Sequence, residues 1–228
     1  TMKQWGKSPK EIDPAVSGRV PVLLSRDNRY FQDEYQGLPL HGFTKIFDKM
    51  LDHPGIDVRL SVDAKDVMEL DPESENKVLF EDQPFMGDVI FTGALDQLFD
   101  CRFGQLPYRS LRFDFEHYKQ KFYQSHGVVN YTVSEDFTRI TEFKYLSGQL
   151  DEDETTIVKE YPMAYTGKEG EIPYYAINNP ENDALFERYK GLVDQIPGFH
   201  LLGRLAEYKY YNIDAIVERA LDLAETIL

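Results

Sequence analysis

The sequence predicts a mixed α and β protein with an antiparallel β-sheet over residues 105–177. Two observations support this fold class. Stretches rich in β-branched and aromatic residues follow one another closely and are separated by brief polar breaks, which is typical of strands joined by short turns. These stretches are 111–115, 128–133, 138–143 and 155–161. Before and after them, apolar residues recur at three- and four-residue intervals, the spacing of one helical face.

The part before the sheet should begin with a segment that has no long helix, followed by one helix and two strands. Pro9, Pro14 and Pro21 exclude a long helix from residues 1–34. Apolar residues between 43 and 51 lie at helical intervals and predict a helix. Further along, we expect a strand over 56–62, a hairpin-like loop over 71–76, and an apolar strand over 89–93 that ends at a glycine.

The part after the sheet should consist of a helix, a strand and a second helix. Residues 183–193 are amphipathic, and 199–202 form a short apolar strand. The final helix begins near Asn212 or Asp214, either of which is a candidate cap. One helical face carries Ile213, Ile216, Val217, Ala220, Leu221 and Ala224. The start of this helix would offer unpaired N–H groups to an electron-rich ligand oxygen.

Composition excludes several classes of function. The 228 residues are 42% hydrophobic, and 25 Lys and Arg face 40 Asp and Glu, which gives a net charge of −15. This charge repels nucleic acid and anionic membranes. Cys101 is the single cysteine and the five histidines are scattered, so we predict no internal disulfide and no metal site. No apolar run reaches membrane-spanning length, and the cytoplasm is the simplest compartment.

The segment Gly203–Tyr211 reads Gly-Arg-Leu-Ala-Glu-Tyr-Lys-Tyr-Tyr and precedes the final helix. It resembles the C-terminal flavin-binding segment of the UDP-galactopyranose mutases. Further blocks resemble the same family in the same order along nearly all of the chain. They are Lys3–Gly6, Arg26–Phe31, Tyr35–Gly37, Phe91–Gln97, Tyr108–Leu111, Phe137–Ile140, Lys159–Pro162 and Pro173–Tyr175.

The resemblance implies a flavoprotein isomerase that interconverts UDP-galactopyranose and UDP-galactofuranose, for galactofuranose biosynthesis and a cell-surface polysaccharide. In that family, reduced FAD attacks the anomeric carbon through N5, UDP leaves, and the N5–sugar adduct opens and recloses. The implied partner is UDP-galactose, and a homodimer is possible. The Gly-x-Gly-x-x-Gly fingerprint of the family is missing from this sequence. We therefore expect a C-terminal portion that binds FAD incompletely and is inactive in isolation.

The resemblance also implies a division into domains. Residues 1–34 would be the remnant of a helical domain with a mobile loop, and 35–104 and 178–228 would be segments of a Rossmann-like flavin-binding domain. Residues 105–177 would form the antiparallel substrate domain.

Site residues follow by matching this sequence to the family motifs. Two arginines would stabilise the departing diphosphate as catalytic residues, because a guanidinium fork fits phosphate oxygens bidentately: Arg19 and Arg139. The implied substrate-binding residues are Trp5, Tyr30, Arg109, Asn130, Glu160, Tyr175 and Tyr210, and Tyr174 could exchange roles with Tyr175. The implied cofactor-binding residues are Gly203, Arg204, Tyr211, Asn212 and Ile213. Asn212 stands where the family often has aspartate, which puts a role for that carboxylate in doubt.

Two other functions stay open at this point. A flavoprotein oxidase of the amine-oxidase kind would share the helix, the strand and the flavin segment, but paired arginines such as Arg19 and Arg139 argue against an amine cleft. A sugar-nucleotide-binding module without catalysis is the second alternative, which the missing dinucleotide fingerprint favours for these residues alone.

Overall fold

The computed structural model describes residues 2–6, 8–11, 24–27, 29, 31–71, 73–150 and 153–228. The chain divides into two compact units, each built from two stretches of sequence. The first unit joins Thr1–Val58 to Leu111–Met163, and the second joins Arg59–Ser110 to Ala164–Leu228. These divisions differ from the predicted domain boundaries near 35, 105 and 178, which stay a prediction.

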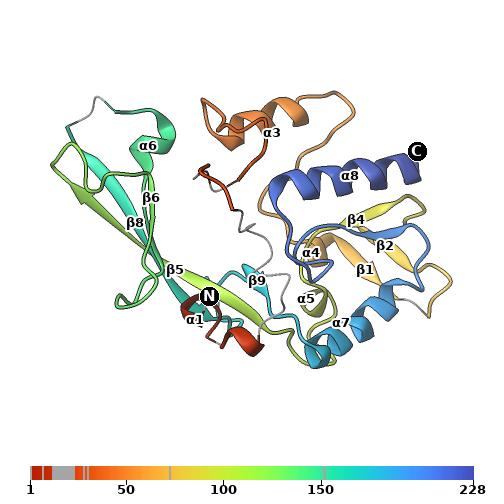
Figure 1. Cartoon of the computed structure of the whole chain (residues 1–228). Helices are drawn as coiled ribbons and strands as arrows, with labels where there is room; N and C mark the ends of the chain where they lie inside the picture. The colour runs from red at the N-terminus through yellow and green to blue at the C-terminus, as the bar shows by residue number, and fades with distance from the viewer. Residues whose placement is uncertain are drawn as a thin grey trace. The chain divides into compact units, whose positions relative to one another are not determined.

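The first unit is built on an antiparallel sheet (Figure 1). Its strands lie in the order β6-β7-β8-β5. The strands are β5 (Tyr108–Tyr118), β6 (Val128–Asn130), β7 (Arg139–Glu142) and β8 (Thr155–Ala164). Its helices are α1 (Met2–Trp5), the 3-10 turn η1 (Pro9–Glu11), α3 (Phe43–Leu51) and α6 (Phe143–Ser147). The predicted sheet strands and the predicted helix at 43–51 are therefore confirmed.

Buried branched side chains hold the centre of this sheet. Ile140 on β7 and Ile157 and Val158 on β8 are buried, and β7 and β8 pair antiparallel. Each of them loses nearly all its contact with water, worth roughly 1.5–3 kcal/mol for a fully buried branched side chain. Glu142, at the end of β7, is also fully buried. Its carboxylate accepts hydrogen bonds from the N–H groups of Tyr123 and Gln124, at 2.9 Å each, and from Thr155 Oγ1 at 2.6 Å.

The strand predicted over residues 56–62 is wrong. This stretch forms no regular element and all of its residues are exposed. Ser61 adopts φ +59°, the left-handed conformation, which interrupts an extended backbone. The alternation of apolar residues therefore has no sheet partner in the described part of the chain.

The second unit contains two small sheets, one antiparallel and one parallel. Strands β1 (Met68–Leu70), β2 (Val78–Phe80) and β3 (Gln83–Pro84) form antiparallel hairpins, which confirms the predicted loop between β1 and β2. The parallel pair is β4 (Val89–Phe91) and β10 (Phe199–Leu201). Strand β9 (Tyr175–Ala176) pairs antiparallel with the first residues of β5.

Two helices of the second unit, α5 (Leu95–Leu98) and α7 (Pro180–Val193), pack around an aromatic core. The unit also contains α4 (Ala64–Val67) and α8 (Ile213–Ile227). Asn179 begins α7 by accepting hydrogen bonds from the N–H groups of residues 181 and 182, and Pro180 occupies the first helical position, where a missing N–H costs nothing. The core contains Leu95, Leu106, Tyr108, Phe186, Tyr189, Val193 and Tyr208. The predicted helices at 183–193 and after 212, and the strand at 199–202, are confirmed.

Two buried tyrosines of this core should respond with opposite signs to loss of their hydroxyl. Tyr108 Oη is buried and has no hydrogen-bond partner among the described residues, whereas Tyr208 Oη donates to Pro107 O at 2.5 Å. Tyr108→Phe should leave the free energy of unfolding unchanged or raise it by up to about 1 kcal/mol, and Tyr208→Phe should lower it by about 1 kcal/mol. Urea unfolding of the full-length gene product measures both values. Equal losses in the two variants would show that the Tyr108 hydroxyl has an acceptor.

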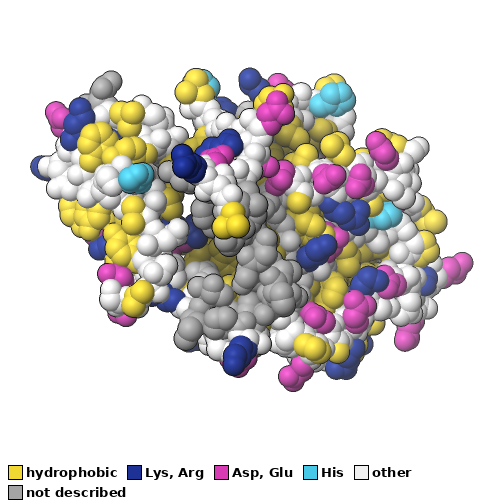
Figure 2. Space-filling model, viewed as in Figure 1, with side chains coloured by type: hydrophobic (Ala, Val, Ile, Leu, Met, Phe, Trp, Pro, Cys, Tyr) yellow, Lys and Arg dark blue, Asp and Glu magenta, His cyan; other side chains and the backbone are white. Residues whose placement is uncertain are grey.

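Acidic and basic side chains are interspersed on the face drawn in Figure 2. None of the helices in the described ranges has both the length and the apolar character needed to cross a bilayer.

Candidate functional site

Three predicted site residues of the first unit lie in one row across its sheet. In the register of β6 and β7, Asn130 is opposite Arg139, and in the register of β7 and β8, Arg139 is opposite Glu160. Directly paired residues of an antiparallel sheet place their side chains on the same face. The register therefore brings together an amide, a guanidinium and a carboxylate that lie up to 30 positions apart in the sequence.

Arg139 is the centre of this row and has a buried donor. Its Nε lies 3.5 Å from Glu160 Oε2, which is an ion pair. The same Nε is buried and makes no hydrogen bond within the described chain, so the pair lacks hydrogen-bond geometry. The guanidinium side chain as a whole is 39% exposed. An arginine that is partly desolvated, reachable from solvent and not fully hydrogen-bonded can bind an anionic ligand by donating hydrogen bonds to it.

Glu160 titrates above the usual range for a glutamate. Burial raises its pKa from 4.5, and the opposing charge of Arg139 lowers it by less. Burial is the larger effect because only 12% of the side chain is exposed and the ion pair is long. Ionisation of the buried Glu160 carboxyl group therefore lowers the stability of the folded protein, and this effect depends on pH.

Glu160→Gln should become more stable relative to wild type as pH rises from 4 to 8. The folded pKa of Glu160 exceeds its unfolded value, so wild type loses stability as pH rises through this interval, whereas the amide does not titrate. Thermal unfolding of both forms of the full-length gene product at a series of pH values gives the difference. If the wild type instead becomes more stable relative to the variant as pH rises, the ion pair with Arg139 affects the pKa of Glu160 more than burial does.

Trp5 belongs to the same unit and lies at the end of α1, half buried. Sequence reasoning missed the residue that holds this helix in place. Lys3 Nζ donates 2.7 Å hydrogen bonds to the carbonyls of Tyr131 and Phe137, which flank the loop between β6 and β7. The sequence feature that could have indicated this role is the position of Lys3 in the Lys-Gln-Trp-Gly block. Lys3 therefore ties the helix of Trp5 to the two strands that carry Asn130 and Arg139.

The second unit presents a column of rings and cations. The guanidinium of Arg204 lies 4.3 Å from the centroid of the Tyr210 ring. The Tyr210 ring stacks on Tyr175, with centroids 6.3 Å apart and planes 17° apart. Tyr175 pairs in turn with Arg109 across β9 and β5. The ring of Tyr174 is tilted by 45° against that of Tyr175, whereas Tyr175 stacks on Tyr210, so the geometry favours Tyr175 for the predicted role. These four residues supply two cations and two phenols for an anionic or planar ligand.

The segment between β10 and α8 holds the predicted cofactor residues. Arg204 donates from Nε and Nη2 to the carbonyl of Tyr211, at 2.8 and 2.5 Å. Gly203 has φ +103°, and the space beside its Cα is open, so the backbone can be approached closely there.

Helix α8 begins after Asn212, the predicted cap. Asn212 occupies the N-cap position, but its side chain makes no capping hydrogen bond. The first N–H groups of the 15-residue α8 therefore remain available to a ligand oxygen. An open glycine, a fixed arginine and an uncapped helix start fit the electron-rich pyrimidine edge of a flavin.

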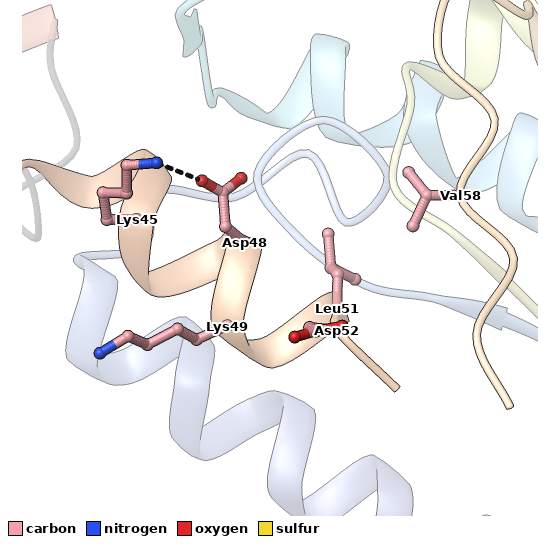
Figure 3. Close-up of a pocket in the computed structure, with 6 residues that line it drawn as sticks. All are labelled: Lys45, Asp48, Lys49, Leu51, Asp52 and Val58. Carbon is pink, nitrogen blue, oxygen red and sulfur yellow. Dashed lines mark hydrogen bonds and ion pairs between the residues drawn. The ribbon is translucent and has the colours of Figure 1, made fainter. Parts of the chain in front are cut away.

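The hollow in Figure 3 is not part of this arrangement. Its lining comes from α3 and the residues after it: Lys45, Asp48, Lys49, Leu51, Asp52 and Val58. Lys45 Nζ pairs with Asp48 at 3.3 Å, and Lys49 points away from that pair. None of the predicted site residues that the structure describes lines it, and Lys45 already faces a carboxylate on an exposed helix. The row and the column are therefore better candidates for a functional site than this hollow.

Two predicted residues, Arg19 and Tyr30, lie outside the described residues. The others fall into the two units: the row in the first, the column and the cofactor segment in the second. Their roles in substrate and cofactor binding stay predictions.

Comparison with known proteins decides the family. The family named UDP-galactopyranose mutase matches residues 1–210. The chain belongs to that family. It is 41% identical to the UDP-galactopyranose mutase of Mycoplasma pneumoniae over 234 aligned positions, which cover 100% of this chain and 57% of the relative. Identity to the enzyme of the same name from Mycoplasma genitalium is 38%, covering 100% of this chain and 56% of the relative.

Another relative of the chain is named for a different nucleotide sugar. The dTDP-fucopyranose mutase of Escherichia coli is 32% identical, covering 98% of this chain and 57% of the relative. The chain is therefore similar both to a mutase named for UDP-galactopyranose and to one named for dTDP-fucopyranose. The chain spans little more than half the length of these curated relatives.

Proposed function

We propose that the protein acts as a UDP-galactopyranose mutase, interconverting UDP-galactopyranose and UDP-galactofuranose for galactofuranose-containing cell-surface polysaccharide. The observation that carries the proposal is the row of Asn130, Arg139 and Glu160, in which a buried arginine donor has no acceptor among the described residues. A diphosphate would supply that acceptor. Glu160 and Asn130 flank Arg139 in the strand register, and the Glu160 carboxylate pairs with its guanidinium.

In this proposal, Arg139 binds the diphosphate and stabilises the charge that develops as UDP leaves the sugar. In the second unit, as the resemblance implies, the hydroxyls of Tyr175 and Tyr210 would donate hydrogen bonds to phosphate oxygens, and Arg109 would contribute a cation. Arg19 and Tyr30 would complete the diphosphate site, as the resemblance implies, and Trp5 would line the sugar-nucleotide cleft.

The cofactor in this proposal is FAD, held by Gly203, Arg204, Tyr211, Asn212 and Ile213. When bound and reduced, FAD supplies the nucleophilic chemistry at the anomeric carbon. The residues of this chain orient the flavin: the open backbone at Gly203 permits close approach, and the start of α8 donates N–H groups to the pyrimidine edge. The parallel strands β4 and β10 with α8 would belong to a Rossmann-like flavin domain. We place the enzyme in the cytoplasm, and a homodimer is compatible with the proposal.

Nucleotide binding tests this function. The full-length gene product that contains these residues should bind UDP at least about tenfold more tightly than uridine, because the arginines contact the diphosphate; tenfold corresponds to about 1.4 kcal/mol. Isothermal titration measures both affinities. Equal affinity for UDP and uridine would contradict the proposal.

The Escherichia coli relative favours one other candidate, a mutase of a thymidine nucleotide sugar. Titration of dTDP beside UDP separates the two. Tighter binding of dTDP would assign the thymidine nucleotide.

A further inference from the structure

Glu207 lies inside the cofactor segment, but no role in the proposed reaction is yet attached to it. Its side chain is only 17% exposed. Carboxylate Oε2 accepts a 2.9 Å hydrogen bond from Gly203 N, and Oε1 accepts a 3.2 Å hydrogen bond from Arg219 Nε. The backbone N–H of Glu207 also donates to Gly203 O at 2.9 Å. Both polar atoms of the Gly203 backbone are therefore bonded to the same residue.

The far end of the segment meets the same carboxylate. Burial raises the pKa of the Tyr211 phenol, and the negative charge of the nearby Glu207 carboxylate raises it further. Tyr211 is also the residue whose carbonyl holds the Arg204 guanidinium. One carboxylate thus accepts from the Gly203 N–H, pairs with Arg219 on α8, and acts on the nearby Tyr211 phenol.

We infer that Glu207 is a positioning residue that fixes the cofactor segment 203–213 before a ligand binds. The inference rests on the proposed function, since the segment is the predicted flavin contact. Arg219 belongs to α8, so the Glu207–Arg219 ion pair ties the turn after β10 to the helix whose start faces the ligand. A segment already ordered loses less conformational entropy on binding, which strengthens the affinity.

The pair also fixes the column beside it. Arg204 stacks on Tyr210 while its Nε and Nη2 donate to Tyr211 O. Loss of the Glu207 carboxylate frees the Gly203 N–H next to Arg204 and the Arg219 guanidinium on α8. We therefore expect the stack and the helix start to lose their fixed geometry together.

The test uses Glu207→Gln in the full-length gene product, with Asp194→Asn as the matched control. Asp194 forms an exposed ion pair with Lys190 on α7 of the same unit, away from the cofactor segment. Titration of the apoprotein with FAD gives the dissociation constant, hydrogen exchange of the Gly203 amide reports the order of the segment, and thermal unfolding reports stability.

Glu207→Gln should exchange the Gly203 amide about tenfold faster and weaken FAD binding about tenfold, the usual effect of losing one hydrogen bond to a charged group. Arg219→Met should do the same, Arg219→Lys should restore part of the loss, and the double variant Glu207→Gln/Arg219→Met should lose little more than either alone. Asp194→Asn should change neither readout.

Faster exchange with an unchanged dissociation constant would overturn the positioning role and leave Glu207 a purely structural residue. Unchanged exchange would overturn the network itself. A wild type that binds no FAD would overturn the proposed function along with this inference, whereas a wild type and a Glu207→Gln variant that bind FAD equally would overturn the inference alone.

Discussion

Arg139→Met in the full-length gene product should lower kcat for the isomerisation of UDP-galactofuranose by about 100- to 1,000-fold, the usual loss when one preorganised charge stabiliser is removed. The methionine keeps a similar volume on β7 but removes the guanidinium that would meet the departing diphosphate. Arg139→Lys should recover only part of the rate, because an ammonium keeps the charge and loses the fork. Steady-state kinetics of both variants give kcat and KM separately.

Arg112→Met is the matched control for this experiment. Arg112 lies on β5 of the same unit, stacks 4.1 Å from the centroid of the Tyr161 ring and pairs with Asp114. Its replacement removes an equal charge from the same unit without touching the row, and turnover should not change. A loss of rate equal to that of Arg139→Met would trace the effect to the charge of the unit rather than to the row.

Glu142→Leu should lower the free energy of unfolding of the full-length gene product by about 3 kcal/mol or more, since each buried donor left without an acceptor costs about 1–3 kcal/mol. Its carboxylate accepts from two backbone N–H groups and one hydroxyl, and the leucine accepts none. Urea unfolding measures the difference.

Two further variants interpret that result. Glu142→Gln should lie between wild type and Glu142→Leu, because its amide keeps one acceptor but turns an N–H group toward the donors. Glu154→Gln is the exposed comparison: Glu154 pairs with His117 at the surface and should cost less than about 1 kcal/mol. An equal cost at Glu142 and Glu154 would contradict the account of the buried carboxylate.

Local pattern predicted the elements of the fold well wherever a face is buried. Periodicity predicts the strands of the sheet, the helix at 183–193, the apolar strand at 199–202 and the final helix. Burial selects every second residue in a strand and every third or fourth residue in a helix. The strand predicted at 56–62 failed because alternation does not reveal the left-handed Ser61. How the chain divides into units depends on contacts distant in sequence, which periodicity does not contain.

The candidate site could be predicted only through family resemblance. Asn130, Arg139 and Glu160 matched family motifs, but their alignment in one row depends on the register of two strand pairs. That register is set by loops and turns that carry no periodic signal. Glu207 was overlooked because a glutamate in an acidic chain is usually solvated, although it stands four residues after Gly203, a spacing that lets its carboxylate return to the Gly203 N–H.

Conversion of UDP-galactofuranose to UDP-galactopyranose by the full-length gene product tests the central proposal most directly. The reaction is followed by chromatography with the flavin chemically reduced and, in parallel, left oxidised. The account predicts turnover only in the reduced state, with Arg139 required for it. Bound flavin with no turnover in either state would contradict the proposed mutase.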